Sequence, residues 1–235
     1  RYDDLASAQR DIGEALWQTL PQSAQQVLDL GCGTGYWTQR LASHYPEATI
    51  TGLDLAPGML AYAQATYGEA IRWQLGDAAA LPQNDASVEL VFSNLAIQWC
   101  PDIGAVMQEL ARVLAPSGQA RITTLLPGTL HEVATAWQRP EALLQTPDAS
   151  TVQRAIARSG LRLTHYVREQ RRFFYPDLNA VMASIKGVGA QVARPNARLT
   201  RQALATAQVR YESLRTPQGL PVSYHCLTLQ LESAR

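Results

Sequence analysis

A short, mostly apolar run that ends in a loop with glycine at every second position constrains this chain most. The run covers residues 27–30, and the loop contains Gly31, Gly33 and Gly35. A helix-compatible run follows directly at residues 36–43. Glycine is needed where a backbone takes unusual dihedral angles, or where a ligand comes within van der Waals distance of it. The segment therefore predicts a buried strand, a ligand-binding turn and a helix.

Two familiar phosphate-binding loops do not match this pattern. The dinucleotide fingerprint G-x-G-x-x-G requires glycine at position 36, where Tyr36 stands, and no P-loop ending in Gly-Lys-Ser/Thr is present. The spacing G-x-G-x-G after a strand-terminal acid resembles motif I of class I S-adenosylmethionine-dependent methyltransferases. Asp54 ends a second apolar run, 48–55, and its carboxylate could accept hydrogen bonds from both hydroxyls of a ribose. A purely structural turn in another α/β protein is the alternative.

Strand-like and helix-like segments alternate through the first half of the chain. The expected strands are 26–30, 48–55, 71–75, 88–93 and 119–126, and the expected helices are about 34–44, 57–67 and 103–114. Such alternation predicts a parallel sheet with helices on both faces. The Pro-Ser-Gly sequence at 116–118 is a turn signal that separates the expected helix 103–114 from the expected strand 119–126. Two more expected strands, 162–174 and 222–232, complete the prediction. The fold class is α/β, a doubly wound, mostly parallel seven-stranded sheet of the Rossmann-like class I methyltransferase type, with a small helical cap.

The length of 235 residues fits one large α/β domain with a small appended lid. We expect residues 1–235 to form a single methyltransferase domain with an N-terminal arm over about 1–20. A helical cap is expected over about 176–214. Residues 176–192 are expected to form a helix followed by a glycine-rich turn at 186–189, and residues 199–214 a second helix. The threonine at position 200 would cap the second helix.

Bulk properties exclude several classes of partner. Twenty basic residues balance 20 acidic ones, which argues against a nucleic-acid-binding surface. No apolar run approaches the roughly 20 residues needed to cross a bilayer, so we expect no membrane span. Cys32, Cys100 and Cys226 lack metal-ligand spacing and suit a reducing compartment. The expected protein is cytoplasmic, and it binds no metal.

The predicted strand ends converge on one edge of the sheet, where ligands of such folds bind. Asp77 follows the third strand, and in the methyltransferase family the matching acid and the next backbone N–H, here that of Ala78, recognise adenine. Asn94 ends the fourth strand and could bind the amino group of the cofactor. Both residues could instead be ordinary turn residues. The predicted S-adenosylmethionine-binding residues are Tyr2, Gln9, Gly31, Cys32, Gly33, Gly35, Asp54, Leu55, Met59, Asp77, Ala78 and Asn94.

The residues after the fourth strand indicate which acceptors are disfavoured. An adenine N-methyltransferase would show Asn/Asp-Pro-Pro-aromatic at 94–97, where this chain has Asn-Leu-Ala-Ile. A cytosine methyltransferase would need Pro-Cys, whereas Cys100 precedes Pro101. The stretch 95–99 has no acids for a metal-assisted catechol mechanism. A carboxylate acceptor is already ionised at pH 7 and needs no general base.

Four further clusters sharpen the assignment: SNLAIQWC at 93–100, TTLLPGTL at 123–130, IKGVGA at 185–190 and PVSYH at 221–225. With Tyr2-Asp3, Ala6 and Gln9 at the start, they resemble malonyl-acyl-carrier-protein O-methyltransferase, the BioC family of biotin synthesis. The resemblance runs from Tyr2 to about His225 and is weakest over 139–160. It implies methyl transfer from S-adenosylmethionine to the free carboxylate of a malonyl thioester on acyl carrier protein, at the start of pimeloyl and biotin synthesis.

This resemblance directs attention to basic residues in the second half of the chain. Lys186, the only lysine, His225 and Arg139 could anchor the substrate carboxylate, although Lys186 could also be a surface lysine at a helix end. Acyl carrier proteins are acidic, so a basic docking face is expected. Its candidate residues are Arg168, Arg171, Arg172, Arg194, Arg198 and Arg201. Malonyl-coenzyme A as the thioester, a free small carboxylic acid or a quinone-type ring as the acceptor, and a non-catalytic cofactor-binding module are the alternatives.

Overall fold

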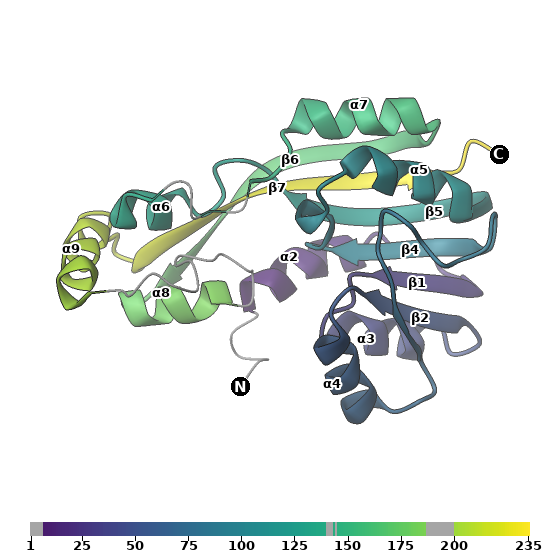
Figure 1. Ribbon diagram of the computed structural model, residues 1–235, viewed down its shortest axis with the longest axis horizontal. Coiled ribbons are helices and arrows are strands. Elements are labelled where there is room, and N and C mark those ends of the chain that lie inside the picture. The colour runs from purple at the N-terminus through teal and green to yellow at the C-terminus, as the bar shows by residue number, and fades with distance from the viewer. Residues whose placement is uncertain (1–6, 140–142, 144, 187–199) are drawn as a thin grey trace. The chain divides into compact units, whose positions relative to one another are not determined.

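A computed structural model describes residues 7–139, 143, 145–186 and 200–235 (Figure 1). The chain divides into two compact units, each built from separated segments. Unit 1 comprises Arg1–Ile12, Leu125–Thr146 and Arg168–Cys226. Unit 2 comprises Gly13–Thr124, Pro147–Val167 and Leu227–Arg235. The described helices include none that is long and apolar enough to cross a membrane.

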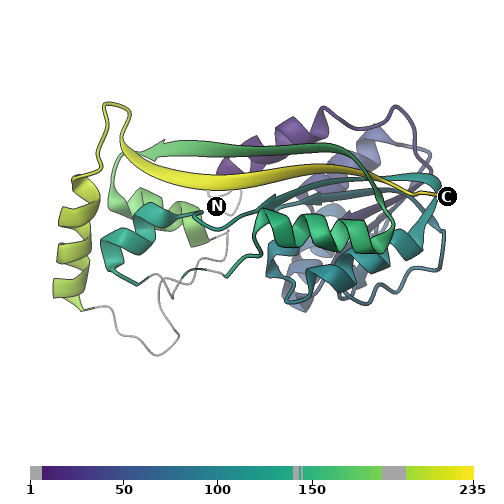
Figure 2. The same ribbon diagram turned by 90° about the horizontal axis from the view of Figure 1, so that it is seen from above.

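Seven strands form one sheet in the order β3-β2-β1-β4-β5-β7-β6. The strands are β1 (Gln26–Leu30), β2 (Thr49–Asp54), β3 (Arg72–Leu75), β4 (Val88–Asn94), β5 (Leu114–Leu125), β6 (Arg162–Tyr175) and β7 (Leu220–Glu232). β1 pairs in parallel with β2 and β4, β2 with β3, and β4 with β5. The long strands β6 and β7 lie side by side (Figures 1 and 2). The predicted doubly wound, mostly parallel seven-stranded sheet is confirmed.

The helices begin and end where the local chemistry of the chain directs. They are α2 (Ser7–Trp17), α3 (Tyr36–His44), α4 (Pro57–Tyr67), η1 (Ile97–Trp99), α5 (Ile103–Val113), α6 (His131–Trp137), α7 (Ala149–Ser159), α8 (Leu178–Ile185) and α9 (Arg201–Glu212). α3 starts two residues later than expected because Gly35 is left-handed, with φ 91°. Pro57 opens α4, and Asp102 caps α5 by accepting a hydrogen bond from the Ala105 N–H at 3.0 Å.

One expected turn is wrong in kind. Residues 116–118 were expected to separate α5 from a strand that begins at position 119. In the structure β5 already begins at Leu114, and the register with β4 shifts between Val88 and Leu90. Ser117 has φ 62° inside this shift. The Pro-Ser-Gly sequence therefore makes an irregularity within the strand, because Leu114 pairs with Val88 before the bend.

The core of unit 2 holds the second half of α2 against α3. Phe92 and Leu41 are fully buried in it. The Arg40 guanidinium lies 4.3 Å from the ring centre of Trp17, on α2, and also forms an ion pair with Glu14. A Cβ on Gly13 would come within 2.2 Å of the Trp37 ring, so only glycine permits this close approach. These contacts fix the second half of α2 within unit 2.

Unit 1 contains α6, α8 and α9. α6 and α9 pack together, and Arg210 donates a hydrogen bond to the Ala136 carbonyl at 3.2 Å. The predicted cap of α9 is confirmed, since Thr200 Oγ1 accepts from the Ala203 N–H at 3.0 Å. α8 is the helix expected at the start of 176–192, and the glycine-rich turn expected at 186–189 lies, after Lys186, outside the described residues. The arm, the cap and the single-domain organisation stay predictions.

Candidate cofactor site

The glycine loop joins β1 to α3 in unit 2, and its three glycines have different surroundings. Gly31, Gly33 and Gly35 have φ of 77°, 54° and 91°, which favour glycine at all three positions. A Cβ on Gly31 would lie 2.2 Å from the Ala96 Cβ, and one on Gly35 would lie 2.7 Å from the Trp73 ring. A Cβ on Gly33 would meet no atom of the described residues within 4 Å. The open space at Gly33 fits a ligand that lies against the loop.

The loop is tied to the end of β2. Its N–H groups at Gly31 and Cys32 both donate to the Leu53 carbonyl, at 2.8 and 3.0 Å. Asp54 Oδ2 accepts from the Gly33 N–H and Oδ1 from the Ala56 N–H, each at 2.9 Å. A carboxylate oxygen can accept two hydrogen bonds, so both oxygens of the half-buried Asp54 retain capacity for hydroxyl donors. Burial also raises the pKa of the Cys32 thiol, which keeps it protonated.

A second acid, Asp29, lies on β1 just before the loop. Only 2% of its surface is exposed, and Thr38 donates a hydrogen bond to its Oδ2 at 2.7 Å. Burial raises the pKa of Asp29 from 3.8 to about 7; the Thr38 bond opposes this shift and the nearby Asp54 charge adds to it. Asp29 was not among the predicted site residues. Its position as the strand-terminal acid of motif I was the signal that could have singled it out.

Asp77 follows β3, and its hydrogen bonds show the turn-capping role considered for it. Its Oδ1 accepts from the Ala79 N–H at 2.8 Å, and its carbonyl accepts from the Ala80 N–H at 3.0 Å, so it does cap a turn. Within the described part of the chain, its Oδ2 and the Ala78 N–H make no hydrogen bond. An exposed acceptor and the next backbone donor are therefore available together, as recognition of an adenine edge requires.

Asn94 ends β4 and is held in place from β5. Thr123 Oγ1 donates to Asn94 Oδ1 at 2.7 Å and accepts from the Leu95 N–H at 3.1 Å. Leu95 itself has φ 53°, so the chain turns sharply here. Gly13 also lies close to the Asn94 side chain, because a Cβ added to Gly13 would be 2.9 Å from Asn94 Nδ2. These contacts set the orientation of the Asn94 amide.

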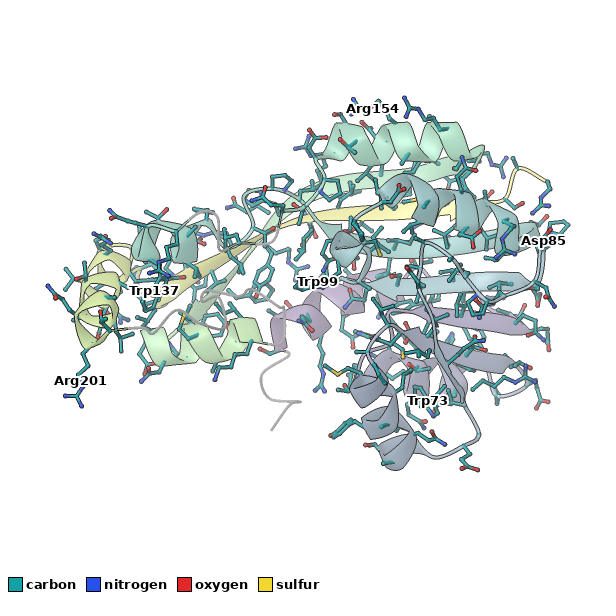
Figure 3. All side chains as sticks on the ribbon, in the orientation of Figure 1. Trp73, Asp85, Trp99, Trp137, Arg154 and Arg201 are labelled. Atoms are coloured by element: carbon teal, nitrogen blue, oxygen red, sulfur yellow. The ribbon has the colours of Figure 1, made fainter. Side chains whose placement is uncertain are left out.

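Large apolar side chains are exposed near the same strand ends. They are Leu55 (69%), Met59 (36%), Tyr62 (48%), Leu75 (58%) and Trp99 (46%), the last labelled in Figure 3. Leu55 lies just after β2, and Met59 and Tyr62 lie in α4. Leu75 ends β3, and Trp99 is in η1. Exposed apolar side chains that follow the carboxyl ends of parallel strands lie toward the edge where ligands of such sheets bind. Together with the open loop and the available acceptors, they fit an adenosine ligand. Sequence reasoning included Leu55 and Met59 but missed the other three.

The remaining predicted residues belong to unit 1. Gln9 is in the first turn of α2, Arg139 and Lys186 are exposed just after α6 and α8, and His225 is half-buried on β7. The His225 N–H donates to Thr129 Oγ1 at 3.0 Å. Tyr2, Arg194 and Arg198 lie outside the described residues. No group of three or more His, Cys, Asp or Glu side chains in the described ranges could hold a metal ion.

The docking arginines that the structure describes also belong to unit 1. Arg168 and Arg172 are exposed on β6, and Arg201 is exposed at the start of α9 (Figure 3). Arg171 differs from them, because it pairs with Asp11 at 2.8 Å and with Glu169 at 3.6 Å.

Comparisons with known proteins agree with this fold. Residues 27–118 match the model of a family described as a methyltransferase domain. The structure of an S-adenosylmethionine dependent methyltransferase from Mesorhizobium loti aligns with a TM-score of 0.62 at 19% identity, over 97% of this chain and 99% of that one. The fold and the glycine-loop site thus define a class I S-adenosylmethionine-dependent methyltransferase.

Two relatives show to which family of methyltransferases the chain belongs. Malonyl-[acyl-carrier protein] O-methyltransferase of Hahella chejuensis is 37% identical over 236 residues, which cover 95% of this chain and 83% of that protein. The biotin biosynthesis bifunctional protein BioHC of Cellvibrio japonicus is 38% identical over 98% of this chain, which spans 47% of that longer protein. The chain belongs to the malonyl-[acyl-carrier protein] O-methyltransferase family, as its motifs predicted.

Proposed function

We propose that this protein methylates the free carboxylate of a malonyl thioester carried on acyl carrier protein, at the start of pimeloyl and biotin synthesis. The observation that carries the proposal is the extent of the family relationship. The general methyltransferase model matches only residues 27–118, all of them in unit 2. The relationship to the Hahella chejuensis enzyme covers 95% of this chain and so includes unit 1.

The cofactor half of the reaction is assigned to residues of unit 2. Asp54 would accept from the ribose hydroxyls, Asp77 and the Ala78 N–H would bind adenine, and Asn94 would bind the methionine portion. Leu55 and Met59 supply exposed apolar surface for the adenosine. The negative charge of Asp29, when ionised, favours a cationic ligand. When bound, S-adenosylmethionine supplies an electrophilic methyl group.

In the acceptor half of the reaction, the substrate carboxylate has to be oriented rather than deprotonated. A malonyl carboxylate is ionised at neutral pH, so no general base has to remove a proton. The requirement is a cation that holds the carboxylate in line with the methyl group. Lys186, Arg139 and His225 are assigned to this task. The exposed Lys186 and Arg139 have no ion-pair partner within the described residues of the chain, so both charges remain available.

Binding of the carrier protein is assigned to the arginines of unit 1. An acidic partner is attracted to a basic face, which raises the association rate and fixes orientation. Arg168, Arg172 and Arg201 are exposed and suit this role. Arg171 contributes less, since Asp11 and Glu169 already neutralise part of its charge.

Turnover with a panel of acceptors tests the proposal. Malonyl-acyl carrier protein, malonyl-coenzyme A and free malonate are each incubated with S-adenosylmethionine, and methyl ester formation is measured. We expect a malonyl thioester to be the preferred acceptor. Activity on free acids or a quinone but on neither thioester would overturn the proposal. S-Adenosylhomocysteine binding without any turnover would indicate a non-catalytic binding module.

A further inference from the structure

The connection between β3 and β4, residues 76–87, carries Asp77 and contains no helix. One side of this connection has little packing beneath it. A cavity of about 420 Å³ lies there, lined by residues of β1, β2 and β3, by Val88, and by Pro82, Gln83, Asn84 and Ser87 of the connection itself. Beside this cavity Gln83 Nε2 donates to Gln74 Oε1 of β3 at 2.8 Å, and the connection makes further polar contacts with α5.

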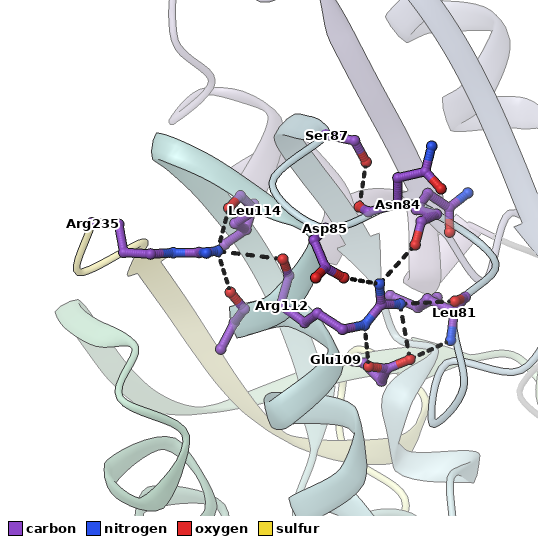
Figure 4. Close-up of polar contacts among 10 residues, drawn as sticks. Leu81, Asn84, Asp85, Ser87, Glu109, Arg112, Leu114 and Arg235 are labelled. Carbon is purple, nitrogen blue, oxygen red and sulfur yellow. Dashed lines mark hydrogen bonds and ion pairs between the residues drawn. The ribbon is translucent and has the colours of Figure 1, made fainter.

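Arg112, in the last turn of α5, supplies most of these contacts (Figure 4). Its Nη1 donates to the Gln83 carbonyl at 2.9 Å and to Asp85 Oδ1 at 2.8 Å. Its Nη2 donates to the Leu81 carbonyl at 2.9 Å and to Glu109 Oε1 at 3.1 Å, and its Nε donates to Glu109 Oε2 at 2.7 Å. These bonds use all five N–H donors of a guanidinium group.

Glu109 completes the arrangement from the same face of α5. Its Oε1 also accepts from the Leu81 N–H at 2.8 Å, so the N–H and the carbonyl of Leu81 are both held by this ion pair. The hydrogen bond from Arg112 lowers the pKa of Glu109, which therefore stays ionised at neutral pH. Charge-assisted bonds of this kind are stronger than neutral ones.

Leu81 is only a short turn away from Asp77. An isolated bridge pairs Asp77 with Ala80, and the Ala80 N–H donates to the Asp77 carbonyl at 3.0 Å. The Leu81 side chain is 6% exposed and anchors the end of the turn. A Cβ added to Gly76 would meet Leu53 at 2.8 Å and Pro82 at 3.3 Å, so the two ends of the turn lie close together. Fixing Leu81 therefore fixes the place of Asp77.

We propose that Arg112 and Glu109 are positioning residues for the cofactor, which set its affinity by holding the turn that presents Asp77 and the Ala78 N–H to adenine. The inference rests on the role proposed above for Asp77. Neither residue has to touch the cofactor or the acceptor. Their loss is expected to weaken cofactor binding and to leave the methyl-transfer step unchanged once the cofactor is saturating.

Calorimetric titration with S-adenosylhomocysteine tests this, with Arg112→Gln and Glu109→Gln as variants. We expect each to weaken binding about tenfold, the effect of losing one or two charge-assisted bonds. The KM for S-adenosylmethionine should rise by a similar factor while kcat and the acceptor KM stay unchanged. Arg112→Lys, which keeps the charge and fewer donors, should fall between the parent and Arg112→Gln. Unchanged cofactor affinity in Arg112→Gln, whatever its Tm, would overturn the proposal.

Arg215→Gln is the matched control. Arg215 also pairs with a glutamate three residues before it, through Nε and Glu212 Oε2 at 2.7 Å, and donates to the Pro176 carbonyl at 3.0 Å. It belongs to unit 1, so its loss should leave S-adenosylhomocysteine affinity unchanged.

A thermodynamic cycle separates action through Asp77 from a general loss of order. Asp77→Asn, Arg112→Gln and the double variant are titrated with S-adenosylhomocysteine. If Arg112 acts through Asp77, the double variant binds only slightly more weakly than Asp77→Asn. Fully additive losses would contradict the proposal. This titration needs no acceptor, so its outcome stands even if the parent enzyme fails to methylate malonyl thioesters.

Discussion

Replacing Asp29 with asparagine should stabilise the cofactor-free protein increasingly as the pH rises. Asp29 is almost fully buried, and its one hydrogen-bond partner among the described side chains is Thr38. Burial raises its pKa from 3.8 to about 7. The folded state therefore binds a proton that the unfolded state has already lost between these pH values. The favourable contribution of Asp29 is complete below pH 3.8 and is lost as the pH rises through about 7.

The size of the effect follows from this shift. Three pKa units correspond to about 4 kcal/mol at 1.36 kcal/mol per unit. About 3 kcal/mol of this falls between pH 5 and pH 8. Asparagine keeps an oxygen that can accept from Thr38 but adds a buried amide N–H, which costs about 1–3 kcal/mol at every pH. The difference between two pH values removes this constant cost.

The assay is urea unfolding followed by circular dichroism, with the parent and Asp29→Asn measured at pH 5 and pH 8. Relative to the parent, we expect Asp29→Asn to gain about 3 kcal/mol of unfolding free energy between pH 5 and pH 8. The same variant should bind cationic S-adenosylmethionine less tightly, because the charge beneath the loop is gone. A stability difference that is the same at both pH values would refute the reasoning, since Asp29 would then ionise as readily in the folded as in the unfolded protein.

Three other predictions concern the site. Asp54→Ala should weaken S-adenosylhomocysteine binding about 100-fold in calorimetry, because it removes the ribose acceptors and the bond to the Gly33 N–H; unchanged affinity would exclude this role. Gly31→Ala should lower Tm more than Gly33→Ala, since a Cβ at 31 would lie 2.2 Å from Ala96 whereas one at 33 meets open space; equal Tm values would contradict this. Lys186→Ala should raise the KM for the malonyl thioester and leave S-adenosylhomocysteine affinity unchanged; unaltered turnover would exclude Lys186 as the anchor.

Much of the site was predictable because its signals are local in the sequence. The spacing of Gly31, Gly33 and Gly35 requires a backbone that other residues rarely adopt, and all three have positive φ. Thr200 caps its helix through the N–H three residues later, as predicted. The strand–helix alternation likewise implied a parallel sheet, because each apolar segment needs a layer to cover it. Local rules failed at 116–118, where pairing of Leu114 with Val88 extends β5 through the expected turn.

The sequence by itself therefore determined the fold class, the glycine loop and the order of the acids at the strand ends. Only the tertiary structure decided what surrounds each of them. Asp29 lies in a run that predicts a buried strand, but the Thr38 hydroxyl and the Asp54 charge that also affect its pKa meet it only in the folded chain. Arg112 directs three of its five hydrogen bonds to Leu81, Gln83 and Asp85, about 30 residues earlier in the chain. Desolvation and hydrogen bonding depend on which groups meet in space, and no local pattern encodes those meetings.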